Sequence, residues 1–450
     1  MLVLALPVLA EQLLGVMVGF VDMALAGQIF QTDAHIAAMG SLAYMLWLLN
    51  SLFAAVAIGA TAVVARLAGA GQQSEAAHAS NQSFLLGLVF TIPIALLFGL
   101  FGTTMARLLQ LEGEAAELAG RYLGIVAWSV PMIAIVRVGI ASLRGAGDTI
   151  SGFVAMGAVN VLNVFGSLAL ATGWGPFPNL GWNGLEVGTA VGHAAGGLII
   201  LGCLIAGRGG LPLRIRGLRP DLEMMRRILR VGIPGGIDSL AILLCHLWYL
   251  SIINSLGTAS AADGLGIRIE SLAYLPGTAF QVAAATMAGQ YLGAKDPNRA
   301  FRGVWTALLF GGLVMTVAGF LFAYAGGLFT LMFLPTNDSL IAQTTIELLA
   351  LVAIAMPGLS VTMILTGALR GAGDTRWPLV ITFVGYLLVR LPAAYFLAWD
   401  AVAIPLTSVT LPALGLGIHG AWVAMVIDTF VRAALVLLRF THGGWTRVRV

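Results

Sequence analysis

Charged residues and cysteine are both scarce in this chain of 450 residues. Asp, Glu, Lys and Arg make up only 10% of it, whereas soluble domains carry about 25%. The two cysteines, Cys203 and Cys245, lie in separate apolar runs without a CxxC spacing, which leaves no basis for a disulfide framework or a cysteine metal site. The net charge of +3 is too small to indicate a nucleic-acid partner, and we expect none.

Catalytic motifs are missing as well. The sequence contains no HExxH, no GxSxG and no pair of histidines at metal-ligand spacing. We therefore expect a protein that is not an enzyme and that needs no cofactor.

Long apolar runs dominate what is present. Hydrophobic residues make up 59% of the chain and gather in runs of about 20 residues or more, the length that crosses a bilayer as a helix. A transmembrane β-barrel would instead alternate apolar and polar residues along short strands. The sequence predicts an all-α membrane protein, whose first apolar run is retained as a helix. We place twelve transmembrane helices at 2–24, 37–65, 83–108, 119–142, 150–172, 184–206, 228–255, 264–291, 302–332, 341–369, 377–399 and 418–439.

A seven-residue stretch, LRGAGDT, occurs twice, at 143–149 and at 369–375. Each copy ends an apolar run, so the chain is predicted to be one helical bundle built twice. A phosphate-binding loop is disfavoured, because no lysine follows the glycines and no strand precedes them.

Each copy of this stretch is typical of a turn between two helices. Arg144 and Arg370 suit the negative end of the preceding helix. The two glycines of each copy permit the positive φ that ends that helix. Asp148 and Asp374, each with the Thr that follows it, are predicted to cap the next helix.

Positive charge orients the predicted bundle. Most of the 23 lysines and arginines fall in one set of alternate loops, whereas the opposite loops hold only Arg107 and Arg121. Positively charged loops stay inside. We therefore expect both termini and the basic segment 208–227 in the cytoplasm, with the protein in the plasma (inner) membrane of a bacterial-type cell.

Segment 208–227 is the predicted linker between the copies, and we expect it to lie along the membrane lipid. It separates an N-terminal six-helix lobe, 1–207, from a C-terminal six-helix lobe with a short tail, 228–450. Because six spans are an even number, both copies enter the membrane from the same side and form parallel repeats. That arrangement suits alternating access around a central cleft. We expect a transporter, since a receptor or a channel does not need two halves that rock against each other. We also expect the protein to be a monomer.

Further motifs carry a family resemblance. Together with the two turns, GFVDMALAG at 19–27, ARLAGAGQ at 65–72, RIES at 268–271 and AGQYLGAKD at 288–296 resemble the multidrug and toxic compound extrusion (MATE) family. The likeness covers essentially the whole chain. It implies two six-helix lobes around a V-shaped cleft. It also implies a secondary antiporter that exports small organic compounds, often cationic or amphipathic, using an H⁺ or Na⁺ gradient.

Ionisable residues inside the spans are costly and need a reason. Glu11 aligns with Asp238 in the second copy, so we expect a shared structural role, namely satisfying backbone groups near a helix end. Asp22 aligns instead with Tyr249 and is present in one copy only. It is the candidate coupling residue. Asp22 also occupies the position of the first-helix Asp implicated in coupling in the MATE family, which implies a possible Na⁺ site there.

Neutral residues of the first lobe complete this candidate site. Asn163 and Thr189 resemble family positions that line the first-lobe cavity beside that Asp, although both are also ordinary partners between helices. Ser167 stands where some members have a second Asp. This departure argues against a network of two carboxylates in the first lobe.

The second lobe carries more charge. Arg268 and Glu270 are two residues apart and point to nearly opposite sides of a helix, so they do not simply neutralise each other. Asp428 and Arg432 have the i, i+4 spacing of an ion pair within one helix. For Glu270, pairing with Arg390 or Arg268 and a place in the cavity wall remain alternatives. The candidate cavity and substrate residues of the two lobes are Glu11, Asn163, Thr189, Asp238, Arg268, Glu270, Arg390 and Asp428.

We expect export of organic compounds in exchange for H⁺ or Na⁺. The alternative is a flippase for an anionic lipid-linked precursor, which the second-lobe arginines at membrane depth keep open. A binding or signalling membrane protein without transport is a third and more distant class.

Overall fold

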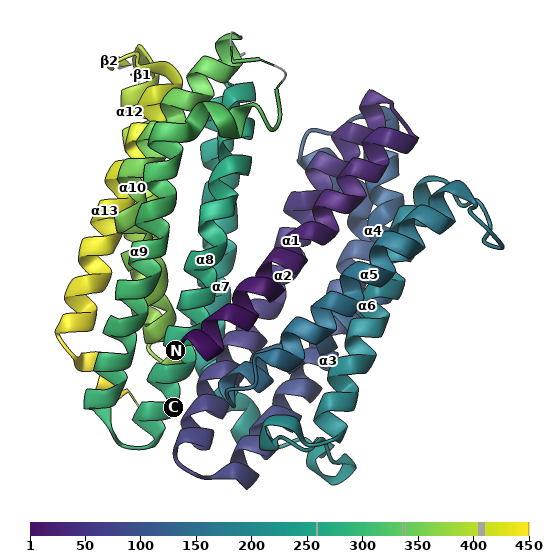
Figure 1. Ribbon diagram of the computed structural model, residues 1–450, viewed down its shortest axis with the longest axis vertical. Helices are drawn as coiled ribbons and strands as arrows, with labels where there is room; N and C mark the ends of the chain where they lie inside the picture. Colours follow the sequence, from purple (N-terminus) through teal and green to yellow (C-terminus); the bar gives the residue numbers. More distant parts are fainter. Residues whose placement is uncertain (258–259, 335, 338, 404–409, 449) are drawn as a thin grey trace. The chain divides into compact units, whose positions relative to one another are not determined.

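Long helices joined by short turns make up nearly all of the protein (Figure 1). The computed structural model describes residues 1–257, 260–334, 336–337, 339–403, 410–448 and 450. Within this part of the chain, eleven helical segments are long and apolar enough to cross a membrane. Another, α8, has 34 residues but carries Asp263, Arg268 and Glu270 in its first half. The predicted all-α membrane fold is thereby confirmed.

Most helices begin before the predicted spans, by ten residues in the third helix, whereas the fifth helix coincides with its span. The first six are α1 (Leu2–Ile29), α2 (Asp33–Gly69), α3 (Gln73–Leu108), α4 (Gly113–Gly145), α5 (Ile150–Thr172) and α6 (Trp182–Ile205). They are followed by α7 (Leu222–Asn254), α8 (Ser260–Gly293), α9 (Pro297–Thr330), α10 (Leu340–Gly371), α11 (Arg376–Phe383), α12 (Leu391–Ala398) and α13 (Gly417–Thr441). A π-helix, η4 (Val384–Arg390), joins α11 to α12. A short antiparallel hairpin of β1 (Ala401–Ala403) and β2 (Thr410–Pro412) precedes α13, with Val402 opposite Leu411.

The chain divides into two compact units. The first unit comprises Leu2–Gly236, Gly289–Asp296 and Val450, and the second comprises Met1, Ile237–Ala288 and Pro297–Arg449. The boundaries fall inside α7 and α8, so the start of α7 and the end of α8 belong with α1–α6.

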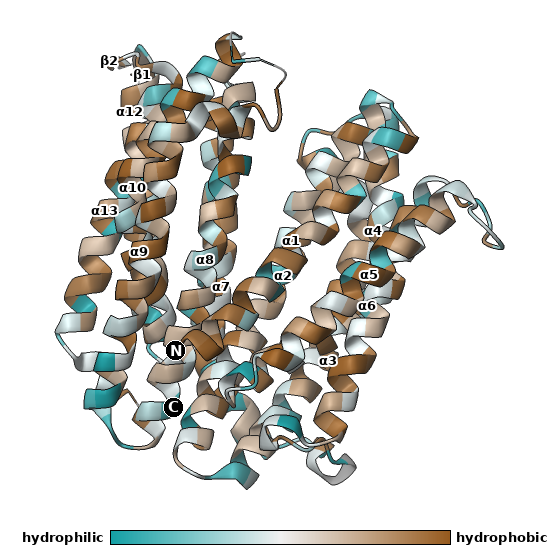
Figure 2. Ribbon diagram, viewed as in Figure 1, coloured by the Kyte–Doolittle hydropathy of each residue, from teal (hydrophilic) through white to brown (hydrophobic). Residues whose placement is uncertain are grey.

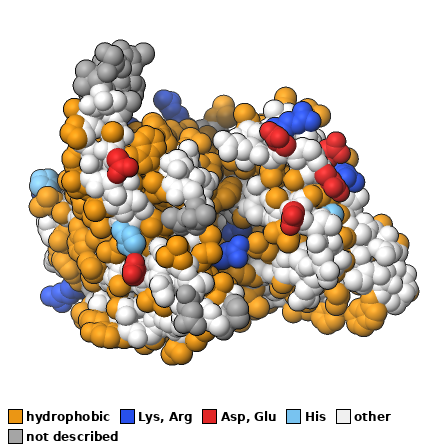
Figure 3. Space-filling view, turned by 90° about the horizontal axis from the view of Figure 1, so that it is seen from above, with side chains coloured by type: hydrophobic (Ala, Val, Ile, Leu, Met, Phe, Trp, Pro, Cys, Tyr) orange, Lys and Arg blue, Asp and Glu red, His pale blue; other side chains and the backbone are white. Residues whose placement is uncertain are grey.

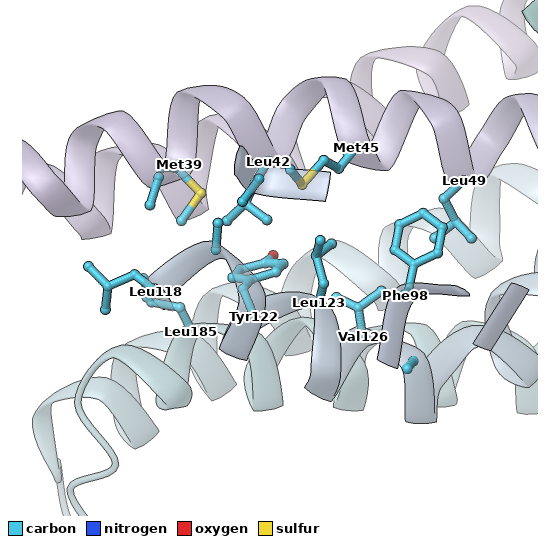
Figure 4. Packing of buried hydrophobic residues seen from close by; sticks show 14 of the residues in the cluster. Met39, Leu42, Met45, Leu49, Phe98, Leu118, Tyr122, Leu123, Val126 and Leu185 are labelled. Atoms are coloured by element: carbon cyan, nitrogen blue, oxygen red, sulfur yellow. The ribbon is translucent and has the colours of Figure 1, made fainter. Parts of the chain in front are cut away.

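Packing of the first unit is clearest between α2 and α4 (Figure 4). In the first half of α2, the buried residues Met39, Leu42, Met45 and Leu49 recur every three or four positions, which places them on one face of the helix. That face meets α4 in a hydrophobic cluster to which Tyr122 contributes its ring. The labelled members are Met39, Leu42, Met45 and Leu49 of α2 and Tyr122, Leu123 and Val126 of α4, with Phe98, Leu118 and Leu185 beside them.

Large apolar side chains are also exposed on the helices of both units, as a lipid-facing surface requires. Trp128 is 89% exposed and Leu388 is 70% exposed. Hydrophobic residues run along the helices, whereas hydrophilic ones gather at helix ends and in loops (Figure 2). The face seen in Figure 3 is mostly hydrophobic or uncharged, with only scattered charged side chains.

The LRGAGDT turns have the same backbone in both units. Gly147 and Gly373 have φ of 93° and 88°, as predicted for residues that end a helix. Gly145 and Gly371 do not, which corrects the expectation for the first glycine of each copy. Both are helical, and a Cβ there would overlap backbone of the helix packed against them, Thr61 of α2 for the first and Ala285 of α8 for the second. They are small because two helices approach closely.

Helix capping at these turns also differs from the expectation. Thr149 and Thr375 make no capping hydrogen bond with their side chains. Asp148 does, since its carboxylate accepts from the backbone N–H of Ser151 at 3.1 Å and from the Ser151 hydroxyl at 2.7 Å. The aspartate alone therefore caps α5.

The predicted linker packs against α3 of the first unit. It contains two 3₁₀ turns, η1 (Arg208–Gly210) and η2 (Ile215–Leu218). The Gln82 side-chain amide donates to the carbonyls of Gly217 and Arg219, both at 2.8 Å. These bonds fix the segment to a helix, in addition to any contact it makes with lipid.

Candidate functional site

Asp22, in the last third of α1, is the centre of a buried polar cluster in the first unit. It is only 2% exposed. One carboxylate oxygen accepts from the Thr189 hydroxyl at 2.8 Å and from the Tyr122 hydroxyl at 3.3 Å. The other accepts from the Asn163 amide at 3.0 Å and from the Ser167 hydroxyl at 3.4 Å. All four donors are neutral, and within the described residues Asp22 forms no ion pair.

The donors are positioned by helix geometry. Asn163 and Ser167 are four residues apart on α5 and so lie on one side of that helix. Thr189 of α6 and Tyr122 of α4 approach from two other helices, so the cluster forms only once the first unit is folded.

Two of the hydroxyls have a second acceptor. The Ser167 hydroxyl lies 2.9 Å from the carbonyl oxygen of Leu185, and the Thr189 hydroxyl lies 3.0 Å from the same oxygen. A hydroxyl has one proton to donate. Each can therefore give it either to Asp22 or to Leu185, which keeps these groups satisfied whether or not Asp22 carries a charge.

Glu186 of α6 is a functional candidate that the sequence reasoning missed. Its side chain is 0% exposed, and neither carboxylate oxygen has a hydrogen-bond partner within the described residues. It precedes Thr189 by three residues, so both lie on the same side of α6. Glu186 interacts electrostatically with Asp22 and Tyr122. The signal was in the sequence, because Glu186 is the one carboxylate in the sixth apolar run.

Comparison with known proteins gives the family. The MatE family model matches residues 7–168 and again residues 234–396, one match in each half. The chain belongs to the MatE family. The resemblance found in the sequence is thereby confirmed, and MatE is a family of membrane transporters, not of enzymes.

Individual relatives match along nearly the full length of this MatE protein. It is 28% identical over 449 residues to the probable multidrug resistance protein NorM of Thermotoga maritima, covering 99% of this chain and 92% of that protein. It is 27% identical over 444 residues to the multidrug resistance protein MdtK of Yersinia pseudotuberculosis, covering 98% and 94%. A solved structure of a multidrug resistance MATE family transporter of the MOP superfamily, in an outward-facing conformation, matches with a TM-score of 0.88 at 20% identity, covering 100% and 96%. That likeness shows a shared fold.

Other predicted site residues of this MatE protein lie in ion pairs that both units repeat. Arg144 donates to Glu11 at 2.5 Å, and Arg370 donates to the aligned Asp238. Glu11 is 5% exposed and Asp238 is 0% exposed. The expectation that these two acids satisfy backbone groups is therefore wrong, because each binds the arginine of an LRGAGDT turn. The contact ties the first helix of each copy to the fourth.

The aspartate of each turn makes a second repeated pair. Asp148 accepts from Arg208, which follows α6, at 3.1 Å, and Asp374 accepts from Arg439, near the end of α13, at 2.6 Å. Partial burial alone would raise the pKa of Asp148, but the bonds from Ser151 and Arg208 outweigh it, so this pKa lies below its ordinary value. Each turn thus binds the first helix of its copy and, through its aspartate, an arginine at or just after the end of the last helix.

The predicted pair of Asp428 and Arg432 in the second unit also includes Arg390. Asp428 is 0% exposed, and its carboxylate accepts from Arg432 at 2.8 and 2.9 Å and from Arg390 at 2.8 and 2.9 Å. Both guanidinium groups lie over the ring of Tyr386, at 4.4 Å for Arg390 and 4.7 Å for Arg432. One carboxylate lies between the two arginines and offsets one of their two positive charges.

Glu270 and Arg268 both lie in the first half of α8. Glu270 interacts electrostatically with Arg390, but Arg390 donates its hydrogen bonds to Asp428. Arg268 is exposed. Among the described contacts, Glu270 forms no hydrogen bond with Arg390, and its place in the cavity wall stays a prediction.

The π-helix η4 shifts the register between the two copies. Gly192 packs against Val159 of α5, and the equivalent Asp428 packs against Gly385 of η4. The residues of α5 and of the matching segment of the second unit therefore differ by 226 positions at this point. After η4, Gly184 packs against Leu170 and Gly420 against Leu397, and the difference is 227. The π-helix thus holds one extra residue. By this register the second unit has Arg390 where the first has Asn163, and Trp422 where the first has Glu186.

Proposed function

We propose that this protein is a secondary active antiporter that exports organic compounds, cationic or amphipathic, in exchange for H⁺ or Na⁺. Asp22 is the residue that binds and releases the coupling ion. The observation that carries this proposal is a buried carboxylate bound by four neutral donors and by no basic side chain of the described chain. The names of the NorM and MdtK relatives, as multidrug resistance proteins, support the substrate class.

A carboxylate in apolar surroundings needs a positive charge nearby. In the second unit, arginines supply that charge to Asp428, but around Asp22 the protein supplies only dipoles. A proton or a Na⁺ ion must then complete the site. No cofactor is required, because the ion gradient provides the energy.

The surroundings of Asp22 suit a group that alternates between two charge states. While Asp22 is ionised, Ser167 and Thr189 donate to it. Once Asp22 holds a proton, the same hydroxyls can donate to the Leu185 carbonyl. For Na⁺, the carboxylate offers oxygen ligands, and the Asn163 carbonyl oxygen is buried without a partner in the described part of the chain.

The second unit gives the flippase alternative little support. The flippase alternative depends on arginines of the second unit that could bind a lipid phosphate. Arg390 and Arg432 instead both donate to Asp428, which occupies donors of both and offsets one of their two positive charges. We therefore favour export of organic compounds over transfer of an anionic lipid.

We further propose a monomer in the plasma (inner) membrane, with lobes 1–207 and 228–450 and with both termini and linker 208–227 in the cytoplasm. Single cysteines at the exposed Pro220 and Phe177 test this orientation in a cysteine-free background. An impermeant thiol reagent added outside intact cells should label Phe177→Cys and spare Pro220→Cys. The opposite labelling would reverse the orientation.

Transport in proteoliposomes tests the function itself. Efflux of a fluorescent organic cation is measured under an imposed H⁺ gradient and, separately, under a Na⁺ gradient. We expect the wild type to respond to one of the two, and Asp22→Asn to respond to neither. Glu117→Gln, which changes an exposed glutamate, is the matched control and should transport normally. Gradient-driven efflux by Asp22→Asn at the wild-type rate would refute the role of Asp22.

A further inference from the structure

We propose that Glu186 is a second carboxylate that binds and releases a coupling cation, so that the first unit carries two positive charges in each transport cycle. One charge is bound at Asp22 and the other at Glu186. The inference rests on the proposed function in taking Asp22 as the first of the two sites.

The burial of Glu186 is the first observation. The side chain is 0% exposed, and both of its carboxylate oxygens lack a hydrogen-bond partner within the described chain. An ionised carboxylate in that position would have no compensation from the protein, which is the costliest way to bury a charge. A bound proton or Na⁺ ion would supply the missing charge.

The position of Glu186 is the second observation. Thr189, three residues later on α6, donates to Asp22 at 2.8 Å, and Tyr122 donates to the same oxygen at 3.3 Å. Tyr122 interacts electrostatically with both Asp22 and Glu186. Glu186 therefore belongs to the same buried cluster as Asp22, although it shares no hydrogen bond with it.

The charged and titratable groups around Glu186 come from three sides. Helix α1 contributes Asp22, and α4 contributes Tyr122 and Arg121. Arg121 is exposed and acts on Glu186 through space, without a hydrogen bond between them among the described contacts. Helix α5 places the neutral Asn163 and Ser167 against Asp22. On α6 itself, His193 lies two turns further on and bonds to the Thr189 carbonyl.

Two nearby carboxylates cannot exchange their cations independently. When both are ionised they repel each other, so the first cation binds more tightly than the second. The pair then loads and unloads in two separate steps. Each step is a simple exchange in which a carboxylate gains one cation on one side of the membrane and loses it on the other. Two bound charges per cycle give a steeper dependence on the ion gradient than one.

The second unit shows that the fold does not require an acid at this position. By the packing of Gly184 and Gly420, Glu186 corresponds to Trp422. Trp422 is 1% exposed, and its indole N–H donates to Asp263 at 2.8 Å. One copy therefore fills the site with a large ring, whereas the other buries a carboxylate without partners.

Infrared difference spectroscopy can count the two sites without transport. The full-length protein in lipid nanodiscs is shifted between acidic and alkaline buffer, and the bands of protonated carboxyl groups are recorded. We expect Glu186→Gln to lack one band of the wild type and Asp22→Asn to lack another. Adding Na⁺ distinguishes the cations, because a band that disappears on addition marks a site that exchanges H⁺ for Na⁺, and a band that stays marks a proton site.

Stoichiometry in proteoliposomes gives the second readout. The membrane voltage at which net transport reverses reports the number of coupling cations per organic cation. We expect this number to fall by one in Glu186→Gln and in the apolar variant Glu186→Met, and to be unchanged in Glu117→Gln. Wild-type bands together with wild-type stoichiometry in both Glu186 variants would overturn the inference. Normal gradient-driven transport by Asp22→Asn would instead refute the proposed function, whatever Glu186 does.

Discussion

The two units share one set of ion pairs and differ in another. Next to the LRGAGDT turns, Glu11 binds Arg144 in the first unit, and Asp238 binds Arg370 in the second. An ion pair that is present in both copies stabilises a contact that both copies share, namely the packing of the first helix on the fourth. The repeated acids are therefore structural.

Further along the helices, the two units differ in the charged groups that surround their buried acids. The first buries Asp22 among neutral donors and Glu186 without any hydrogen-bond partner in the described residues. The second has Tyr249 in place of Asp22, and its buried Asp428 lies between two arginines. The second unit also buries Asp263, which accepts from the neutral Trp422. We propose that Asp22 and Glu186 are the acids that exchange a cation with solution.

The largest effect on stability is expected at Asp428. Asp428→Asn keeps the shape of the side chain but leaves Arg390 and Arg432 buried without a negative partner. Breaking a buried pair in this way costs about 3–5 kcal/mol. Thermal unfolding of purified protein should show a large loss of stability together with low expression. In Glu347→Gln, which removes an exposed partner of His419, stability should change by less than about 1 kcal/mol. Equal effects of the two substitutions would mean that the buried arginines are compensated elsewhere.

Nearly equal losses are expected from the repeated acids. Glu11→Gln removes the negative charge that binds Arg144, and Asp238→Asn removes the one that binds Arg370. The exposed fractions of the two arginine side chains are 15% and 16%. We expect each change to cost about 3 kcal/mol, at the lower end for a buried pair. Denaturant unfolding measures both. A large loss in one unit and none in the other would break the proposed equivalence of the copies.

The paired turn glycines should give smaller and again matching losses. Gly147→Val and Gly373→Val force a β-branched residue into positive φ, which costs about 1–3 kcal/mol. Thermal shift assays should show the loss, and transport per folded molecule should stay near that of the wild type. Gly157→Ala, at a helical glycine with open space around its Cβ, is the control and should not destabilise the protein. A stable but inactive turn variant would mean that the turns act directly in transport.

The smallest effect concerns the pH dependence of Asp148. Its pKa in the folded protein lies below its ordinary value, so its bonds stabilise the fold above the unfolded pKa of about 3.9 and lose their effect as the pH falls through the folded pKa. Asp148→Asn keeps a capping side chain but removes the charge. Thermal melts across the pH range should therefore show wild type more stable than the variant at neutral pH, with the gap closing in strong acid. A gap that widens toward acid would contradict the assignment.

The architecture could be predicted because hydrophobicity and duplication are local signals. Apolar runs long enough to cross a bilayer gave the helices, and the two LRGAGDT copies gave the repeat. The positive φ at Gly147 followed from residue type. The helical Gly145 could not be distinguished from it, because its size is set by the backbone of another helix.

The sequence did not predict which residues form contacts between helices that are far apart in the chain. Arg144 and Glu11 form an ion pair although 133 residues separate them in the chain. The sequence pattern around either residue does not indicate the other. Comparing the copies separated Asp22 from Glu11, and the two have different kinds of partner in the structure, but it assigned Glu11 the wrong partner. The lengths of the helices do not reveal the extra residue in the π-helix, because α5 and the equivalent segment Arg376–Ala398 both span 23 residues. Without that shift, Arg390 does not align with Asn163.

Side-by-side transport by two acid variants tests most directly the claim that single-copy acids couple transport and repeated acids hold the fold. Asp22→Asn and Glu11→Gln are reconstituted in equal amounts of folded protein, and gradient-driven efflux is measured for each beside wild type. We predict that Asp22→Asn is stable and shows no gradient-driven efflux, whereas Glu11→Gln is less stable but retains efflux per folded molecule. Retained efflux in Asp22→Asn, with loss in a folded Glu11→Gln, would contradict the account.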